Sequence, residues 1–269
     1  MLTINLNKIS LKLLPDGEPL FSLPGTGPNT IAHLECSITS PTRLFILQQA
    51  CEILGHNGTF IQSLYIPYLM GQRMDRRIDD YHSLTLRVVS EIINDLSIPQ
   101  VKVFAPHSDT VLACIADSQE DIRTLKTLYN NAAKTADTIV LPDLGMGKRW
   151  FNTIAHDLYY FEHLKDKNVV IADKKRDMQT GKLSGFRIIE GKPHGTCVIL
   201  DDLCDGGGTF IGLAKVLRES PEVTSVNLAV AHGIFSKGLS LDGIDEIWTT
   251  NSYQNFSHGV KGLHVQSCF

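Results

Sequence analysis

Short apolar runs alternate with amphipathic helical patterns along most of this 269-residue chain. The runs typical of buried strands are 60–68, 101–104, 138–141, 168–172, 196–200, 226–231 and 246–250. Between them, helices are expected from Pro41 to Gly55 with Ser40 as cap, after Ser83, within 150–164, and from Thr209 to Arg218. Strands that alternate with helices favour parallel sheets covered by helices. We therefore predict an α/β fold.

The length of the chain favours two domains or one large α/β unit. The polar segment 117–136 is expected to be helical and to form the junction between them. We place the boundary between residues 125 and 126, which gives domains 1–125 and 126–269. Because the alternation is similar in both halves, the two domains are expected to be related, each with a mostly parallel sheet flanked by helices.

The overall charge is modest: the formal net charge is −4, and 20% of the residues are charged. A general attraction to nucleic acid or to an anionic membrane is therefore not expected. The six cysteines show no C-x-x-C spacing, which is typical of reduced thiols in a cytosolic protein. No signal-peptide pattern and no apolar run of about 18 residues is present, so we expect a soluble cytoplasmic protein.

The strongest chemical signal follows the strand at 196–200. Two acids, Asp201 and Asp202, precede a loop that contains Asp205 and three glycines, Gly206, Gly207 and Gly208, and ends at Thr209. Glycines let backbone N–H groups approach an anion closely, and a following helix start adds partial positive charge. The acid pair suits sugar hydroxyls or a metal ion. A phosphorylated sugar fits this combination, and a glycine turn with an acidic cap is the structural alternative.

Other strand ends carry charged residues whose function is ambiguous when each is taken alone. They are Asp143, Gly145, Lys148 and Arg149 after 138–141; Arg73, Asp75, Arg76 and Arg77 after 60–68; Lys174 and Arg176 after 168–172; and His107 after 101–104. Arginine and lysine clusters suit polyphosphate. A tight turn, a solvated run of charge and a hydrogen-bonded structural histidine are the alternatives.

Taken in order, these segments resemble the ribose-phosphate diphosphokinases, which make 5-phosphoribosyl 1-diphosphate (PRPP). Six stretches follow the family order: Leu14–Glu18, Arg73–Arg76, Ala105–His107, Pro142–Met146, Lys174–Arg176 and Asp201–Thr209. The corresponding family motifs are F-x-D-G-E, R-Q-D-R, D-x-H, P-D-x-G-G, K-R-R and D-D-x-x-D-T-G-G-T. The similarity extends from about Leu13 to Ser252. The chain is identified as a short, divergent member.

The resemblance implies two phosphoribosyltransferase-like domains and pyrophosphoryl transfer from ATP, with Mg²⁺, to the anomeric hydroxyl of ribose 5-phosphate. It implies that Lys174 and Arg176 are catalytic and that His107 and Asp143 bind Mg²⁺. ATP would be bound by Asp16, Glu18, Arg73, Asp75, Arg76 and His107. Asp143, Gly145, Lys148 and Arg149 would form a pyrophosphate loop. Asp201, Asp202, Asp205, Gly206, Gly207, Gly208 and Thr209 would bind the ribose phosphate. A homo-oligomer, a dimer or larger, is implied as well.

The chain departs from the family pattern at positions that concern the acceptor. Gly206 stands where the family usually has Thr, which is expected to open space beside the 5-phosphate, and Ala105 replaces an acid near His107. The alternative acceptor is therefore a ribose with a larger 5-substituent such as ADP-ribose, which would connect the enzyme to NAD metabolism, and Trp150 could then contact the adenosine end. A phosphoribosyltransferase and a non-catalytic, partner-binding relative stay open as further alternatives.

Overall fold

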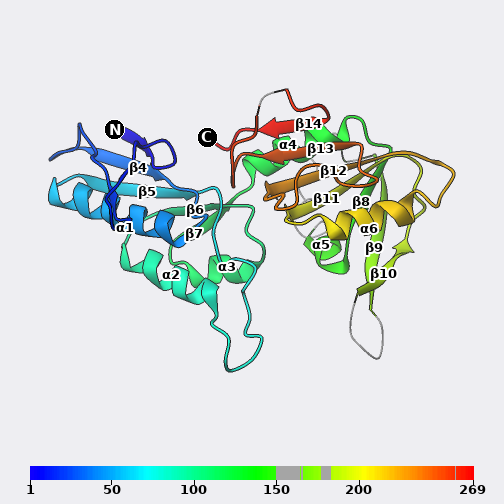
Figure 1. Cartoon of the computed structure of the whole chain (residues 1–269), viewed down its shortest axis with the longest axis horizontal. Coiled ribbons are helices and arrows are strands. Elements are labelled where there is room, and N and C mark those ends of the chain that lie inside the picture. Colours follow the sequence, from blue (N-terminus) through cyan, green and yellow to red (C-terminus); the bar gives the residue numbers. More distant parts are fainter. Residues whose placement is uncertain (150–163, 165, 177–182, 258) are drawn as a thin grey trace. The chain divides into compact units, whose positions relative to one another are not determined.

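The computed structural model describes residues 1–149, 164, 166–176, 183–257 and 259–269; for residues 149, 174–176, 183 and 184 it describes the backbone alone. These residues divide into two compact units, Met1–Ile122 and Arg123–Phe269 (Figure 1). The expected junction after residue 125 falls inside helix α4 (Arg123–Ala133), which belongs wholly to the second unit.

The first unit is built on a five-stranded parallel sheet with the order β1-β4-β5-β6-β7. Its strands are β1 (Leu2–Asn5), β4 (Ile31–Glu35), β5 (Phe60–Ile66), β6 (Val101–Phe104) and β7 (Ser118–Asp121). A small hairpin pairs β2 (Lys12–Leu13) with β3 (Pro19–Leu20). The helices are α1 (Pro41–His56), α2 (Thr85–Asp95) and α3 (Asp109–Cys114). Buried aliphatic side chains from the sheet and from α1 and α2 form one core.

The second unit contains a seven-stranded sheet with the order β10-β9-β8-β11-β12-β13-β14 (Figure 1). Its strands are β8 (Thr138–Leu141), β9 (Asn168–Arg176), β10 (Leu183–Glu190), β11 (Gly195–Cys204), β12 (Val223–Gly233), β13 (Glu246–Thr250) and β14 (Leu263–Gln266). All neighbouring pairs are parallel except β9 and β10. Helix α4 packs against β11 to β14, α5 (Leu144–Arg149) against β8 and β9, and α6 (Gly208–Leu217) against β10 and β12. The predicted α/β class, with mostly parallel sheets flanked by helices, is confirmed.

Local sequence predicts the central elements well. The strands expected at 101–104 and 138–141 coincide with β6 and β8, and Ser40 caps α1 by accepting the Arg43 N–H at 3.3 Å. All four residues of β8 are buried, as expected for a strand in the middle of a parallel sheet.

Several expected boundaries are wrong. Gly55 does not end α1, which continues to His56; the following turn uses Gly58 instead, at φ +69°. Helix α2 begins after Leu84 rather than Ser83, without a side-chain cap. The segment 117–136 is not one helix, because its first part pairs with β6 as the edge strand β7 before α4 begins. The helix expected within 150–164 lies outside the described residues except for Leu164.

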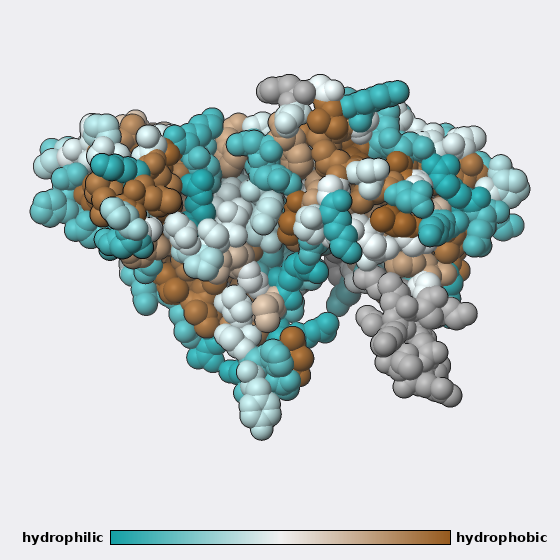
Figure 2. All heavy atoms as spheres, in the orientation of Figure 1, coloured by the Kyte–Doolittle hydropathy of each residue, from teal (hydrophilic) through white to brown (hydrophobic). Residues whose placement is uncertain are grey.

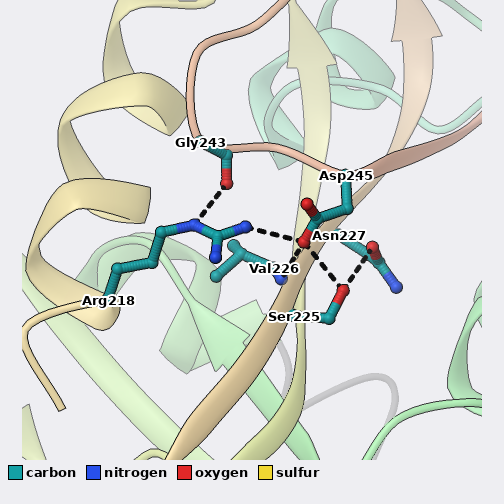
Figure 3. Close-up of polar contacts among 6 residues, drawn as sticks. All are labelled: Arg218, Ser225, Val226, Asn227, Gly243 and Asp245. Carbon is teal, nitrogen blue, oxygen red and sulfur yellow. Dashed lines mark hydrogen bonds and ion pairs between the residues drawn. The ribbon is translucent and has the colours of Figure 1, made fainter. Parts of the chain in front are cut away.

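A polar cluster fixes the far end of α6 to the connection before β13 (Figure 3). One carboxylate oxygen, Asp245 Oδ2, accepts bonds from Arg218 Nη2 at 2.7 Å, the Ser225 hydroxyl at 2.8 Å and the Val226 N–H at 2.8 Å. Arg218 Nε also donates to the Gly243 carbonyl at 3.1 Å. The cluster therefore ties the helix to two neighbouring strands.

The surface mixes polar and apolar side chains, and Figure 2 shows apolar atoms among hydrophilic ones on both units. Large apolar side chains exposed in the first unit include Leu13, Leu20 and Phe60. Among the helices of the described residues, none combines the length and the hydropathy that a membrane span requires.

Candidate functional site

The acid pair lies on the last part of β11, and the glycine loop connects this strand to α6. Asp201 and Asp202 are half-buried, and the Asp202 N–H donates to Asp201 Oδ1 at 2.9 Å. The Tyr129 hydroxyl of α4 donates to the Asp201 carbonyl at 2.9 Å. Helix α4 thus fixes the backbone of the acid pair through this hydrogen bond. The two carboxylates lie near the carboxyl end of a parallel strand, where ligands bind in such sheets.

The loop turns into the helix through a backbone conformation that requires glycine. Gly207 is the N-cap of α6 and has φ +76°, and a Cβ atom there would collide with Leu241. Gly208, the first helical residue, has open space where its Cβ would be. The N-cap makes no side-chain hydrogen bond to the first N–H groups of the helix, and such groups at a helix start point toward the preceding loop. The predicted residues Asp201 to Thr209 are therefore brought together in one strand–loop–helix unit.

The acid pair is electrostatically strained. Burial raises the pKa of Asp201 well above its ordinary value. The charge of Asp202, a hydrogen bond with the Asp202 side chain and the charge of Asp143 raise this pKa further. Asp143 thus contributes to the electrostatics of the acid pair. A sugar hydroxyl that donates to Asp201, or a cation nearby, would favour its charged form.

The segment after β12 covers the glycine loop. Ile234 and Phe235 donate their N–H groups to the Cys204 carbonyl at 2.8 and 3.2 Å, and the Ser236 hydroxyl donates to Asp205 Oδ1 at 2.6 Å. A Cβ on Gly206 would lie 3.4 Å from both Cδ and Cε of Lys237. The stem of a lysine therefore lines the space beside this glycine, at ordinary contact distance from a Cβ placed there.

The segment expected to form the pyrophosphate loop, with Asp143, Gly145, Lys148 and Arg149, is largely helical. Helix α5 begins at Leu144, and Asp143 caps it: Oδ1 accepts the Met146 N–H at 3.0 Å and the carbonyl accepts the Gly147 N–H at 3.0 Å. Neither Gly145 nor Gly147 has a positive φ, so these glycines do not form the expected turn. Lys148 is exposed, and the Arg149 side chain lies outside the described residues.

The lysine–arginine cluster lies within a strand rather than after one. β9 continues to Arg176 because the antiparallel strand β10 pairs with it; Lys174 is opposite Phe186, and Arg176 is opposite Leu183. The predicted end at Ala172 is therefore wrong. The side chains of Lys174 and Arg176, like residue Trp150, lie outside the described residues.

In the first unit, the arginine stretch and His107 follow neighbouring strands. Arg73 and Arg76 are exposed and Asp75 is half-buried after β5, and His107 is exposed after β6. The two segments are joined through Gln72, whose Oε1 accepts the His107 N–H at 3.1 Å.

Asp16 and Glu18 lie elsewhere in this unit, exposed in the turn of the β2–β3 hairpin, where Asp16 Oδ1 accepts the Glu18 N–H at 3.1 Å.

Sequence reasoning missed two residues at these places, Gln72 and Lys237. Gln72 is 1% exposed, although it adjoins a charged stretch, and that contrast is invisible in the sequence. Lys237 stands in a loop far along the chain from Gly206, so only the fold brings the two together. For Lys237 the signal that could have helped is its place shortly after a buried strand.

The possible metal ligands do not form a protein cage. Among the described residues, no three His, Cys, Asp or Glu side chains are grouped closely enough to hold a metal ion. Mg²⁺ usually retains waters and binds one or two carboxylates together with substrate phosphates, so the acidic strand ends fit its donor chemistry. The imidazole of His107 is a less suitable direct ligand and fits a contact through water.

Comparison with known proteins finds similarity over nearly the whole chain. No family model matches. Ribose-phosphate pyrophosphokinases are similar in sequence: that of Mycoplasmopsis pulmonis is 24% identical over 97% of this chain and 81% of its own length. That of Ureaplasma parvum is 26% identical over 97% of this chain and 74% of its length.

The fold agrees with the sequence comparison. The crystal structure of phosphoribosylpyrophosphate synthetase from Mycobacterium smegmatis is similar with a TM-score of 0.73 and 19% identity, covering 96% of this chain and 85% of that chain. The chain is thus similar in sequence to the ribose-phosphate pyrophosphokinases and in fold to a phosphoribosylpyrophosphate synthetase.

Proposed function

We propose that the protein transfers the β,γ-pyrophosphoryl group of ATP to the anomeric hydroxyl of ribose 5-phosphate, giving PRPP and AMP. The observation that carries this proposal is the unit formed by the acid pair, the glycine loop and the start of α6, in a chain related to ribose-phosphate pyrophosphokinases. The acid pair offers acceptors for the ribose hydroxyls, and the loop offers N–H donors for a phosphate.

The transfer is a displacement at phosphorus. The anomeric oxygen forms a bond to the β-phosphorus of ATP and loses its proton to solvent, while the bond from that phosphorus to the α,β-bridging oxygen breaks and AMP leaves. Such reactions depend on positioning and on neutralising charge more than on covalent catalysis. Lys174 and Arg176 are assigned to the negative charge on the transferring group, which makes them the residues with the largest expected effect on turnover.

The ATP side is assigned to residues of the first unit. Arg73 and Arg76 would bind the polyphosphate, since arginine pairs well with phosphate oxygens. Asp75 and His107 would support ATP binding, and Asp16 and Glu18 would contact adenine.

On the second unit, Asp143 with Gly145, Lys148 and Arg149 would bind the pyrophosphate. Asp143 and, through water, His107 would hold Mg²⁺, which supplies neutralisation of phosphate charge when bound. We further propose a homo-oligomer located in the cytoplasm.

The test is product analysis with Mg²⁺, ATP and ribose 5-phosphate as the only substrates. The proposal expects AMP and PRPP in equal amounts, and no reaction in EDTA. Release of ADP in place of AMP, or no acceptor-dependent release of either nucleotide, would refute it. Formation of AMP without any base acceptor also separates this activity from that of a phosphoribosyltransferase.

A second acceptor, ADP-ribose, is favoured by one observation. Lys237 brings a cation to the glycine loop beside Gly206, where a diphosphate on the 5-oxygen would carry a second phosphate to be neutralised. The same assay with ADP-ribose tests this candidate. AMP formed faster with ADP-ribose than with ribose 5-phosphate would support it, and equal or faster turnover of ribose 5-phosphate would count against it.

A further inference from the structure

The glycine loop has a cation beside it that is not part of the loop. Lys237 is exposed in the segment that follows β12, and its stem runs along Gly206, with Cδ and Cε 3.4 Å and Cγ 3.7 Å from the position of a Cβ on that glycine. Nζ is bonded to Cε, so the ammonium group must lie beside the same loop. The lysine stem thus lies in contact with the position of a Cβ on Gly206, so a side chain longer than that of alanine would meet it there.

The segment that carries Lys237 is held firmly against the loop. The Cys204 carbonyl, at the end of β11, accepts the N–H groups of both Ile234 and Phe235. Gln254 Nε2 donates to the Ile234 carbonyl at 2.7 Å, and the Ser236 hydroxyl donates to Asp205 Oδ1. Fixing the residues on its N-terminal side limits the positions that the Lys237 backbone can adopt, so the side chain reaches the loop at a low cost in conformational entropy.

No carboxylate neutralises this cation within the described residues, where Lys237 has no ion pair. The acid that adjoins Gly206 in the loop, Asp205, accepts the bond from Ser236. An ammonium beside N–H donors at a helix start forms a combined site for an anion, since both contributions favour negative charge.

We propose that Lys237 is a specificity-determining residue whose ammonium binds the phosphate on the 5-oxygen of the acceptor. This inference rests on the proposed function and deepens it, because it adds a cation to the acceptor side that the six family-like segments do not contain. The shared ligand chemistry is a ribose with a phosphoester at O5, which both ribose 5-phosphate and ADP-ribose provide. Gly206 is the complementary feature, because a side chain that extends beyond Cβ at this position would compete with the lysine stem for space.

The experiment measures acceptor and ATP kinetics for Lys237→Met and Lys237→Arg. Methionine keeps an unbranched stem over Gly206 and removes the charge. Because a charged hydrogen bond to phosphate is lost, the KM for the acceptor should rise about tenfold while kcat and the KM for ATP stay nearly unchanged. Arginine should restore most of the affinity. Lys215→Met, an exposed lysine in the last turn of α6, is the matched control and should behave like the wild type.

Two acceptors distinguish which phosphate is bound. A larger effect of Lys237→Met with ADP-ribose assigns the ammonium to the second phosphate, and equal effects assign it to the phosphate shared by both acceptors. Equal effects support the proposal, whereas a larger effect with ADP-ribose overturns it, because the second phosphate is not bonded to the 5-oxygen. An unchanged acceptor KM with both substrates overturns it, and so does an equal rise in the KM for ATP.

A second variant tests the role of Gly206. Gly206→Val places a branched side chain where the lysine stem lies, so it should raise the acceptor KM in the wild-type background and add little when Lys237→Met is already present. Fully additive effects of the two changes would contradict the proposed competition for space.

Calorimetric binding of each acceptor without ATP keeps this proposal separate from the proposed function. If the wild type binds an acceptor but forms no AMP, the proposed function fails, and Lys237 is judged by whether Lys237→Met weakens that binding. If the wild type binds neither acceptor, both proposals are overturned.

Discussion

The buried side chain of Gln72 bonds to the backbone of His107, with 3.1 Å between Oε1 and the His107 nitrogen. This contact joins the arginine stretch after β5 to the segment after β6. The Gln72 side chain is 1% exposed, and its Nε2 has no hydrogen-bond partner in the described part of the chain. Buried polar groups are usually hydrogen-bonded, and among the described residues this amide makes only the one bond to His107. We infer that this bond fixes the position of His107 in a proposed ATP-binding loop.

Gln72→Met should therefore change ATP binding more than stability. The variant loses one hydrogen bond, about 1 kcal/mol, but it also removes an unpaired buried amide, so the net effect on unfolding should be small. Loss of the fixed position of His107 should raise the KM for ATP about fivefold, with little change in the KM for the acceptor. Gln119→Met, an exposed position on the edge strand β7, provides the control. Equal changes in both KM values would argue against a positioning role.

Asp201→Asn should stabilise the ligand-free protein at alkaline pH. The pKa of Asp201 is raised by burial and by Asp202, so its contribution favours folding below the ordinary value of 3.8 and is lost as pH rises toward the raised pKa. The asparagine variant does not suffer this loss. Its midpoint of thermal unfolding should exceed that of the wild type by more at pH 8 than at pH 5, while its activity falls. A lower midpoint at pH 8 would contradict this account.

Asp245 should show the opposite pH dependence (Figure 3). Although partial burial opposes it, the bonds from Val226, Ser225 and Arg218 lower the pKa of Asp245. Its contribution to stability is therefore present above 3.8 and is lost as pH falls through the lowered pKa. Asp245→Asn should destabilise at pH 7, and the difference from the wild type should shrink in acid. Asp242→Asn, at an exposed carboxylate nearby, should show neither effect.

Substitutions at two neighbouring glycines should affect different properties, stability in one case and acceptor binding in the other. Gly207→Ala should destabilise by at least about 1–2 kcal/mol, because alanine is unfavourable in the left-handed conformation and its Cβ would also meet Leu241. Gly208→Ala should be neutral or stabilising in the first turn of α6, yet its Cβ would project into the open space assigned to the acceptor phosphate. Chemical denaturation and acceptor titration of both variants check this; a Gly208→Ala variant with normal acceptor affinity would contradict the assignment.

Lys174→Ala should lower kcat by at least about a hundredfold and affect the KM for either substrate less, since its charge is assigned to the transferring group. Lys192→Ala, an exposed lysine of the same unit, should retain wild-type turnover. Steady-state kinetics of the two variants decides the matter, and an unchanged kcat in Lys174→Ala would remove this residue from the catalytic role.

The sequence predicted the buried strands and the acid–glycine unit because both depend on local chemistry. β8 is apolar throughout, and the turn at Gly207 needs a glycine, so short stretches of sequence carry these features. The edge strand β7 and the extension of β9 were missed. They depend on pairing with β6 and β10, partners that local patterns do not reveal.

The candidate site was predicted in part for the same reason. The motif residues lie near the ends of strands, some within the strand and some after it, so their approximate places can be read from the chain. Gly206 was expected to leave space, and Lys237, from a segment after another strand, lines that space. Similarly, the pattern Asp143–Met146 suggested a glycine loop, whereas the Asp143 carboxylate caps a helix that the glycines then enter.

The displacement at the β-phosphorus of ATP by the anomeric oxygen is tested most directly with ribose 5-phosphate labelled with ¹⁸O at that oxygen. The proposed function predicts that the label is retained in the diphosphorylated sugar, bridging C1 and phosphorus, and that unlabelled AMP is released. Label in AMP, or transfer of a single phosphate with release of ADP, would contradict it.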